Sequence, residues 1–143
     1  MNFEGSKGRK VVIYFNQKIS YQLKNAKVGE NLRINNLNFE PGSEILLPGS
    51  IPILNDLLDI MVEFPKLVIA IEGHICCDVS DQTNLSGSRA KVVYDFLIRN
   101  GIKSERLSHK GFGSTRPIYQ LPEQNDMQQI SNRRVEIRVI SKN

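Results

Sequence analysis

Apolar positions along the chain follow two different periods, which predict where strands and helices lie. Residues 66–73, KLVIAIEG, form a short apolar run rich in β-branched side chains, which predicts a buried strand ending at Gly73. RRVEIRVI at 133–140 alternates apolar and polar residues and predicts a closing strand, and RLSHKGFG at 106–113 is a third candidate. Leu32, Ile34, Leu37 and Phe39 suggest a fourth strand, broken at Pro41-Gly42.

Two segments have the helical period instead. Ser50 can cap a helix whose first turn tolerates Pro52 and which Pro65 ends. The apolar residues expected on one face of it are Ile51, Leu54, Leu57, Leu58, Met61 and Val62. A second helix is predicted over about 84–100, closed by Gly101. Its expected core face is Leu85, Val92, Val93, Phe96 and Leu97.

The three remaining segments are less regular. Residues 10–15 and 19–23 are predicted to be short strands, the second from its alternating apolar positions. The polar segment 114–131 is longer than connections usually are, which indicates a function or a hidden helix. From residue 31 on, strands alternate with helices, so we expect an α/β sandwich with helices packed on a mixed sheet.

Composition describes an ordinary globular chain of one domain. The 143 residues are 40% hydrophobic and 24% charged, which gives no reason to expect disorder. No apolar run approaches the roughly 18 residues of a membrane helix. The net charge of +4 comes from 19 basic and 15 acidic residues that are interspersed, without the dense basic run typical of nucleic-acid binders. We therefore expect no nucleic-acid partner.

Residues 72–93, EGHICCDVSDQTNLSGSRAKVV, concentrate the candidate chemistry. Their metal-ligand residue types are His74, Cys76, Cys77 and Asp78. A tetrahedral zinc site usually has two spaced pairs, whereas adjacent cysteines cannot readily aim at one ion, so a metal site is disfavoured. No base with an orienting third group accompanies either cysteine, which disfavours an enzyme as well. The plainer interpretation is two small, half-buried residues at a strand end.

Arg89 is the stronger candidate. It falls four residues after Leu85 and three before Val92, on the side of the apolar stripe and near the helix N-terminus. A buried guanidinium there needs an anion, and free amides of the first turn would add donors. This predicts a pocket for an acidic group, namely a carboxylate held by the guanidinium fork. The alternative is an internal ion pair to Asp78, Asp81 or Glu72.

Several motifs together resemble the OmpA-like C-terminal domain. IEGH, NLSGSRAKVVYDFLIRNGI, ERLSHKGFGSTRP and NRRVEIRV occur in the order and spacing of that family, between about residues 32 and 140. The resemblance implies a β-α-β-α-β-β arrangement with the helices on one face of a mixed sheet. The expected division is an N-terminal extension with two short strands at 1–30, followed by the OmpA-like domain at 31–143.

The resemblance also implies a function. Such domains bind the peptidoglycan stem peptide without catalysis or cofactor, on the periplasmic side of the outer membrane, and belong to outer-membrane-associated parent proteins. The family arginine that takes the diaminopimelate carboxylate corresponds to Arg89, and Arg133 matches another position facing the glycan peptide. The full set of expected ligand-binding positions is Ile75, Cys76, Asp78, Gln82, Leu85, Arg89 and Arg133.

The chain departs from the family pattern at its opening motif. Where the family has GHTD, with an aspartate for the ligand ammonium, this chain has GHIC, so Cys76 stands at the aspartate position. Losing one charge-assisted hydrogen bond is expected to weaken diaminopimelate binding by about one to two orders of magnitude. Asp78 or Asp81 is a candidate substitute. The alternative is an envelope protein–protein module with a degenerate pocket.

Two matters stay open at this stage. In the oxidising compartment that the family implies, the cysteines are buried thiols, a vicinal disulfide or an intermolecular bridge. The opening residues, MNFEGSKGRK, lack the apolar middle of a signal peptide. The chain is therefore expected to be either cytoplasmic or a domain of a longer exported protein.

Overall fold

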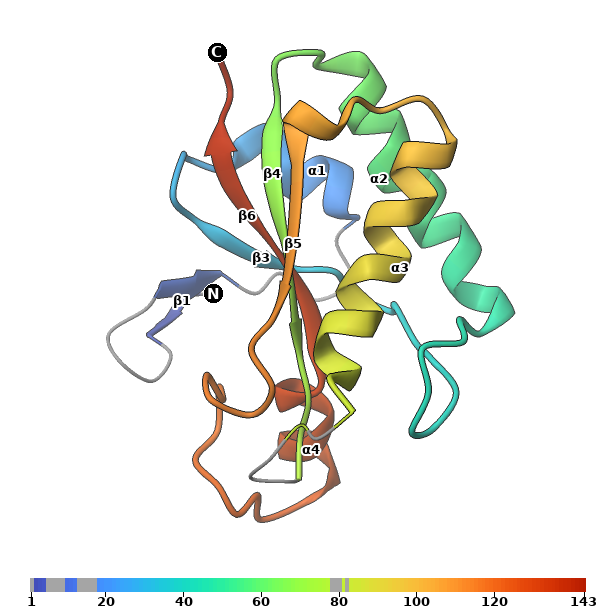
Figure 1. Cartoon of the computed structure of the whole chain (residues 1–143). Coiled ribbons are helices and arrows are strands. Elements are labelled where there is room, and N and C mark those ends of the chain that lie inside the picture. Colours follow the sequence, from blue (N-terminus) through green and yellow to red (C-terminus); the bar gives the residue numbers. More distant parts are fainter. Residues whose placement is uncertain (1, 5–9, 13–17, 78–80, 82) are drawn as a thin grey trace.

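A mixed β-sheet with helices against one face forms the molecule (Figure 1). The computed structural model of the chain describes residues 2–4, 10–12, 18–77, 81 and 83–143. Within these residues the sheet has six strands in the order β1-β2-β3-β6-β4-β5. The strands are β1 Asn2–Glu4, β2 Lys10–Val12, β3 Asn31–Arg33, β4 Val68–His74, β5 Leu107–Gly111 and β6 Arg134–Ser141.

Four helices connect the strands in the described part of the chain. They are α1 Ile19–Asn25, α2 Ile51–Glu63, α3 Leu85–Arg99 and α4 Asp126–Asn132. Two of them, α2 and α3, were predicted. β6 runs antiparallel to both β3 and β4, whereas β4 and β5 are parallel. A parallel pair needs a crossover connection, which α3 supplies. The expected β-α-β-α-β-β arrangement is confirmed, with α4 as an additional helix before β6.

The core lies between the sheet and helices α1 to α3, which Figure 1 shows on the same side of it. Its fully buried side chains include Leu32, Ile69, Ile71, Ile137 and Val139 from the strands and Leu23, Leu54, Leu57, Met61, Val93 and Leu97 from the helices. None of the helices in the described part of the chain is long and apolar enough to cross a membrane.

The predicted strand at residues 19–23 is wrong. These residues belong to α1, and its buried side chains are Ile19, Gln22 and Leu23, whereas Tyr21 is 56% exposed. The spacing i, i+3, i+4 is helical, and α1 packs against α2. Asp56 of α2 fixes it there by accepting hydrogen bonds from both the amide and the hydroxyl of Ser20. Over only five residues, the strand and helix patterns of apolar positions look alike. The packing of α1 against α2 therefore decided that the segment is a helix.

Two further predictions need correction. The strand suggested by Leu32 to Phe39 shortens to β3, and Phe39 forms only an isolated antiparallel bridge with Leu46. On α2, Ile51 and Val62 are 43% and 64% exposed, whereas Ile60 is buried. At about 100° per residue, the buried face is centred on Leu57 and Met61, which leaves Ile51 and Val62 at its edge.

The other elements lie close to their predicted places. Residues 85–99 form α3, and Gly101 follows it with a positive φ of 96°. Val93 and Leu97 of the predicted core face are fully buried. The long polar segment contains the hidden helix α4, capped at Asn125, whose side chain accepts a hydrogen bond from the Gln128 amide. Of the strand predicted at residues 10–15, Lys10–Val12 is β2 and the rest lies outside the described residues.

Candidate functional site

A cavity of about 550 Å³ opens where the end of β4, the start of α3 and the junction of α4 with β6 come together. The segment after β3 forms its opposite wall. The lining residues are Arg33, Ile34, Asn36, Leu37, Asn38, Phe39, Pro41, Gly42, Leu47, His74, Ile75, Cys76, Cys77, Leu85, Arg89, Ile130, Arg133, Arg134 and Val135. We call it the arginine cavity, because the described residues that line it include four arginines and no carboxylate.

Arg89 is held in this wall by contacts with uncharged groups. Its residue is only 6% exposed, and its Nε donates to the Ser43 carbonyl at 2.8 Å. Its guanidinium carbon lies 5.0 Å from the centre of the Phe39 ring, a cation–π contact. Of the internal ion pairs considered from the sequence, Asp81 and Glu72 form none with Arg89, and Asp78 lies outside the described residues.

A second guanidinium faces the same space. Burial lowers the pKa of Arg89, the charge of Arg133 lowers it further, and Glu44 and Asp81 partly oppose this. Arg133 is exposed, at the start of β6, and its side chain has no hydrogen bond or ion pair with the described residues. Two cations that repel each other across a cavity without a carboxylate favour an anionic ligand between them.

The first turn of α3 differs from the expectation that its amides are free. Asp81 occupies them: its Oδ1 accepts from the Leu85 amide at 2.7 Å, and its Oδ2 accepts from the Ser86 amide at 3.2 Å and the Ser86 hydroxyl at 2.5 Å. The Ser86 oxygen in turn accepts from the Gly113 amide at 2.9 Å. These two amides are therefore already occupied, and Asp81 positions the helix that carries Arg89.

Replacing Asp81 by alanine is expected to lower the free energy of unfolding by about 1–2 kcal/mol, because two amides at the start of α3 lose their acceptor. Chemical denaturation followed by circular dichroism measures this. The matched control is Asp59→Ala, which removes an exposed carboxylate of α2 and should change stability by less than about 0.5 kcal/mol. Equal effects of the two substitutions would contradict the capping role.

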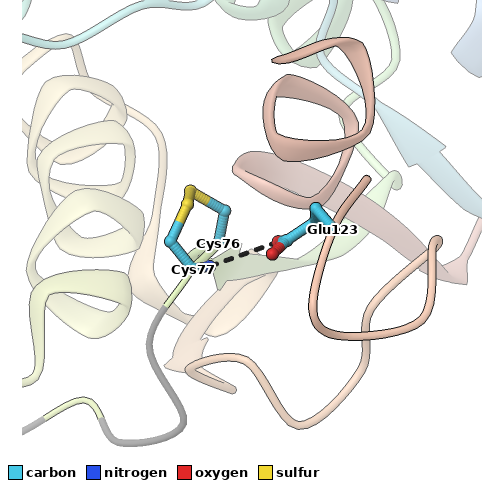
Figure 2. Close-up of side chains that lie close together, drawn as sticks. All are labelled: Cys76, Cys77 and Glu123. Atoms are coloured by element: carbon cyan, nitrogen blue, oxygen red, sulfur yellow. Dashed lines mark hydrogen bonds between the residues drawn. A yellow bond between two sulfur atoms is a disulfide. The ribbon is translucent and has the colours of Figure 1, made fainter. Parts of the chain in front are cut away.

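Cys76 and Cys77 form a disulfide in the wall of the arginine cavity (Figure 2). Of the three states left open by the sequence, the structure thus has the vicinal disulfide. Cys76 is 9% exposed, and Cys77 is exposed with a positive φ of 78°. Because neither sulfur is a thiolate in this form, neither can act as a nucleophile or a metal ligand.

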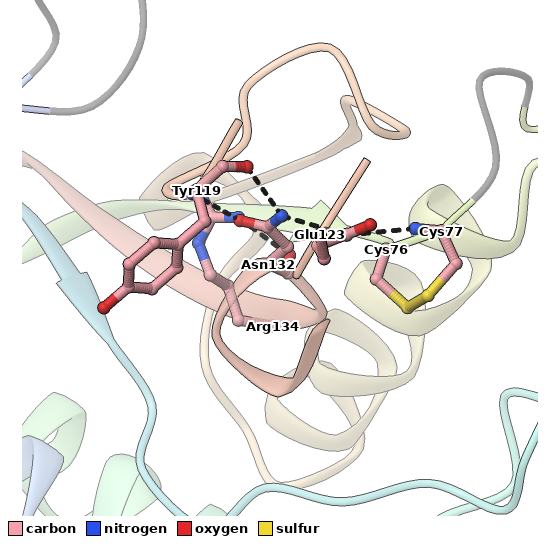
Figure 3. The surroundings of a disulfide bond; sticks show 6 residues. All are labelled: Cys76, Cys77, Tyr119, Glu123, Asn132 and Arg134. Atoms are coloured by element: carbon pink, nitrogen blue, oxygen red, sulfur yellow. Dashed lines mark hydrogen bonds between the residues drawn. A yellow bond between two sulfur atoms is a disulfide. The ribbon is translucent and has the colours of Figure 1, made fainter. Parts of the chain in front are cut away.

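The long loop between β5 and β6 is organised around one buried amide, that of Asn132 (Figure 3). Its Oδ1 accepts hydrogen bonds from the Ile118 and Tyr119 amides at 2.7 and 2.8 Å. Its Nδ2 donates to the Tyr119 carbonyl at 2.9 Å and to Oε2 of Glu123 at 3.0 Å. The loop is therefore held against the end of β4, and Glu123 lies beside the disulfide.

The structure brings most of the residues expected from the sequence into one place. Ile75, Cys76, Leu85, Arg89 and Arg133 all line the arginine cavity, although their role in binding stays a prediction. Asp78 and Gln82 fall outside the described residues. Sequence reasoning missed Arg33, Phe39, Arg134 and Glu123. Arg134 directly follows the expected site residue Arg133, so its place in the sequence could have indicated it. No local sequence feature indicates that Glu123 reaches the disulfide.

Comparisons with known proteins agree with this geometry. Residues 38–134 match the model of the OmpA family. Over 96 residues the chain is 35% identical to the peptidoglycan-binding protein ArfA of Mycobacterium bovis, covering 64% of this chain and 28% of that protein. Over 114 residues it is 30% identical to the probable lipoprotein YiaD of Escherichia coli, covering 76% of this chain and 51% of the relative.

A solved structure shows the same fold. A putative MotB-like protein from Desulfovibrio vulgaris superposes with a TM-score of 0.67 and 27% identity, covering 79% of this chain and 73% of that one. The chain spans only about a quarter to a half of the length of the curated relatives just named. The matched segment is well over half of this chain and contains the arginine cavity's main residues, so the chain belongs to the OmpA family.

Proposed function

We propose that this chain is a non-catalytic module of the cell envelope that binds the peptidoglycan stem peptide in the arginine cavity. The observation that carries the proposal is a cavity whose lining, in the described part of the chain, has four arginines and no carboxylate, with Arg89 and Arg133 facing the same space. In this proposal the two guanidiniums hold the diaminopimelate carboxylate, and Arg89 supplies the bidentate fork. A relative with 35% identity is named a peptidoglycan-binding protein, and the family match indicates no enzyme family.

The proposed location is the periplasmic side of the outer membrane, as part of a protein that anchors an envelope structure to the cell wall. A disulfide between Cys76 and Cys77 supports an oxidising compartment, because cytosolic thiols are kept reduced. Relatives named as a lipoprotein and an outer membrane porin support an envelope setting.

Replacing Arg89 by alanine tests the proposal. We expect affinity for a diaminopimelate-containing stem tripeptide, measured by calorimetric titration, to fall about 10- to 100-fold, the equivalent of one charge-assisted hydrogen-bond interaction. Arg89→Lys keeps the charge but loses the fork, so its loss should be intermediate. Arg99→Ala, an exposed arginine at the other end of α3, is the matched control and should bind as wild type does.

Pull-down with purified sacculi checks the same variants on the natural polymer. Undiminished binding of sacculi by Arg89→Ala would show that the arginine cavity is not the binding site. Wild-type protein that binds neither tripeptide nor sacculi would instead favour the envelope protein–protein module, in which the cavity is degenerate.

A further inference from the structure

The arginine cavity has cationic donors for an acidic group, but the described residues that line it include no carboxylate for a cationic one. The sulfur of Cys76 stands where the family pattern has its aspartate, and it is bonded to Cys77. A ligand that carries both a carboxylate and an ammonium would leave the ammonium without a charged partner there. This part of the inference rests on the proposed function.

A carboxylate from a distant segment reaches this position. Glu123 lies 46 residues after Cys77, and its Oε2 accepts a hydrogen bond from the Cys77 amide at 3.2 Å. One of its carboxylate oxygens and the two disulfide sulfurs all lie within 4.8 Å of one another. Figures 2 and 3 show the Glu123 carboxylate directed at the disulfide from the loop that precedes α4.

The carboxylate of Glu123 is both fixed and charged. The amide of Asn132 holds the same Oε2 at 3.0 Å, and Asn132 is itself fully buried. Burial alone would raise the pKa of Glu123, but the hydrogen bonds from Asn132, from its own amide and from the Cys77 amide outweigh burial and lower it. Glu123 is therefore an anion at neutral pH.

This carboxylate also retains capacity for a ligand. An ionised carboxylate offers about four lone-pair sites, and the bonds from Cys77 and Asn132 both fall on one oxygen. Glu123 is half-buried rather than enclosed, so a donor arriving from solvent can reach it. A half-buried, pre-oriented carboxylate is well suited to an ammonium group, because little of its own motion has to be lost on binding.

We propose that Glu123 is the carboxylate that binds the ammonium group of the ligand, in place of the aspartate that this chain lacks. The arginine cavity then takes the carboxylate of a zwitterionic diamino-acid side chain, and the edge formed by Glu123 and the disulfide takes its ammonium. Specificity for a zwitterion over a simple acid is thus supplied by the loop before α4 rather than by the end of β4.

Two ligands and two variants test this. The ligands are the diaminopimelate stem tripeptide and the same tripeptide with the side-chain ammonium replaced by hydrogen. We expect Glu123→Gln to lower calorimetric affinity for the first about tenfold or more and to leave affinity for the second unchanged. Glutamine keeps an oxygen for the Cys77 and Asn132 donors, and unchanged binding of the second tripeptide shows that the cavity remains folded.

Glu44→Gln is the matched control. The charge of Glu44 acts on Arg89, but Glu44 lies in the segment after β3 that forms the opposite wall of the cavity. Replacing Glu44 should therefore affect the two tripeptides alike. If both tripeptides bind in an Arg89-dependent way and Glu123→Gln weakens them equally or not at all, the ammonium-binding role is overturned while the proposed function stands. If wild-type protein binds neither tripeptide, the proposed function and this inference both fail.

Discussion

Replacing Arg134 by methionine is expected to lower the free energy of unfolding by about 3–5 kcal/mol, because it leaves a buried carboxylate without its main partner. The side chains of Arg134 and Glu136 are 1% and 0% exposed, and their Nε and Oε2 atoms are 2.5 Å apart. The other guanidinium nitrogens donate to the Asn132 and Arg116 carbonyls at 2.8 and 2.9 Å. One substitution therefore also removes the donors for two carbonyl groups.

Urea denaturation followed by circular dichroism measures this effect. Arg138→Met is the matched control, since Arg138 lies on the same strand with an exposed side chain, and it should change stability by less than about 0.5 kcal/mol. The double variant Arg134→Met/Glu136→Met should recover part of the loss, because no carboxylate is then buried without a cation at residue 136. A single Arg134→Met variant as stable as the control would contradict the account.

The recovery should be partial because Glu136 belongs to a larger buried network. The Asn31 amide donates to both Glu72 and Glu136, at 2.7 and 2.9 Å, and so bridges two carboxylates on neighbouring strands. His74 Nε2 lies 3.8 Å from Glu136 Oε1. His74 and Arg134 belong to this network and also line the arginine cavity. The network therefore holds this part of the cavity wall in place.

Gly73→Ala is the second large effect expected, a loss of about 3 kcal/mol in the free energy of unfolding. A Cβ at residue 73 would lie 1.9 Å from the Ser86 carbonyl oxygen, which is helix backbone and cannot turn aside. The first turn of α3 therefore rests directly on the end of β4, with Gly73 at the contact. Moving that turn would also displace Arg89, so ligand affinity should fall together with stability.

Thermal unfolding compared with Gly49→Ala tests this, since a Cβ at residue 49 would meet nothing within 4 Å. The control is expected to stay within about 0.5 kcal/mol of wild type. A Gly73→Ala protein with wild-type stability and ligand affinity would show that α3 does not need this close approach.

The elements with a clear periodicity, and with a proline or glycine that marks an end of the helices, were predictable from the sequence. α2, α3, β4 and β6 each span seven or more residues with a regular pattern of buried positions, and α2 and α3 have a proline or glycine at an end, so local sequence and tertiary burial agree. α1 was not predicted as a helix, because its seven residues fit both the strand period and the helix period. Only its packing on α2 selects the helix. The predicted strand extended beyond β3 because Leu37 and Phe39, further along the chain, pack against the core without joining the sheet.

The sequence by itself determined the fold family and indicated that Arg89 lines a cavity, since a charged residue on an apolar helix face needs a polar space beside it. Only the tertiary structure decided that Cys76 and Cys77 are joined, that Asp81 already occupies the helix amides, and that Glu123 reaches the disulfide. These outcomes depend on atomic distances, and the contact between Glu123 and Cys77 joins segments 46 residues apart. Propensity and periodicity describe one segment at a time and carry no information about distances between segments.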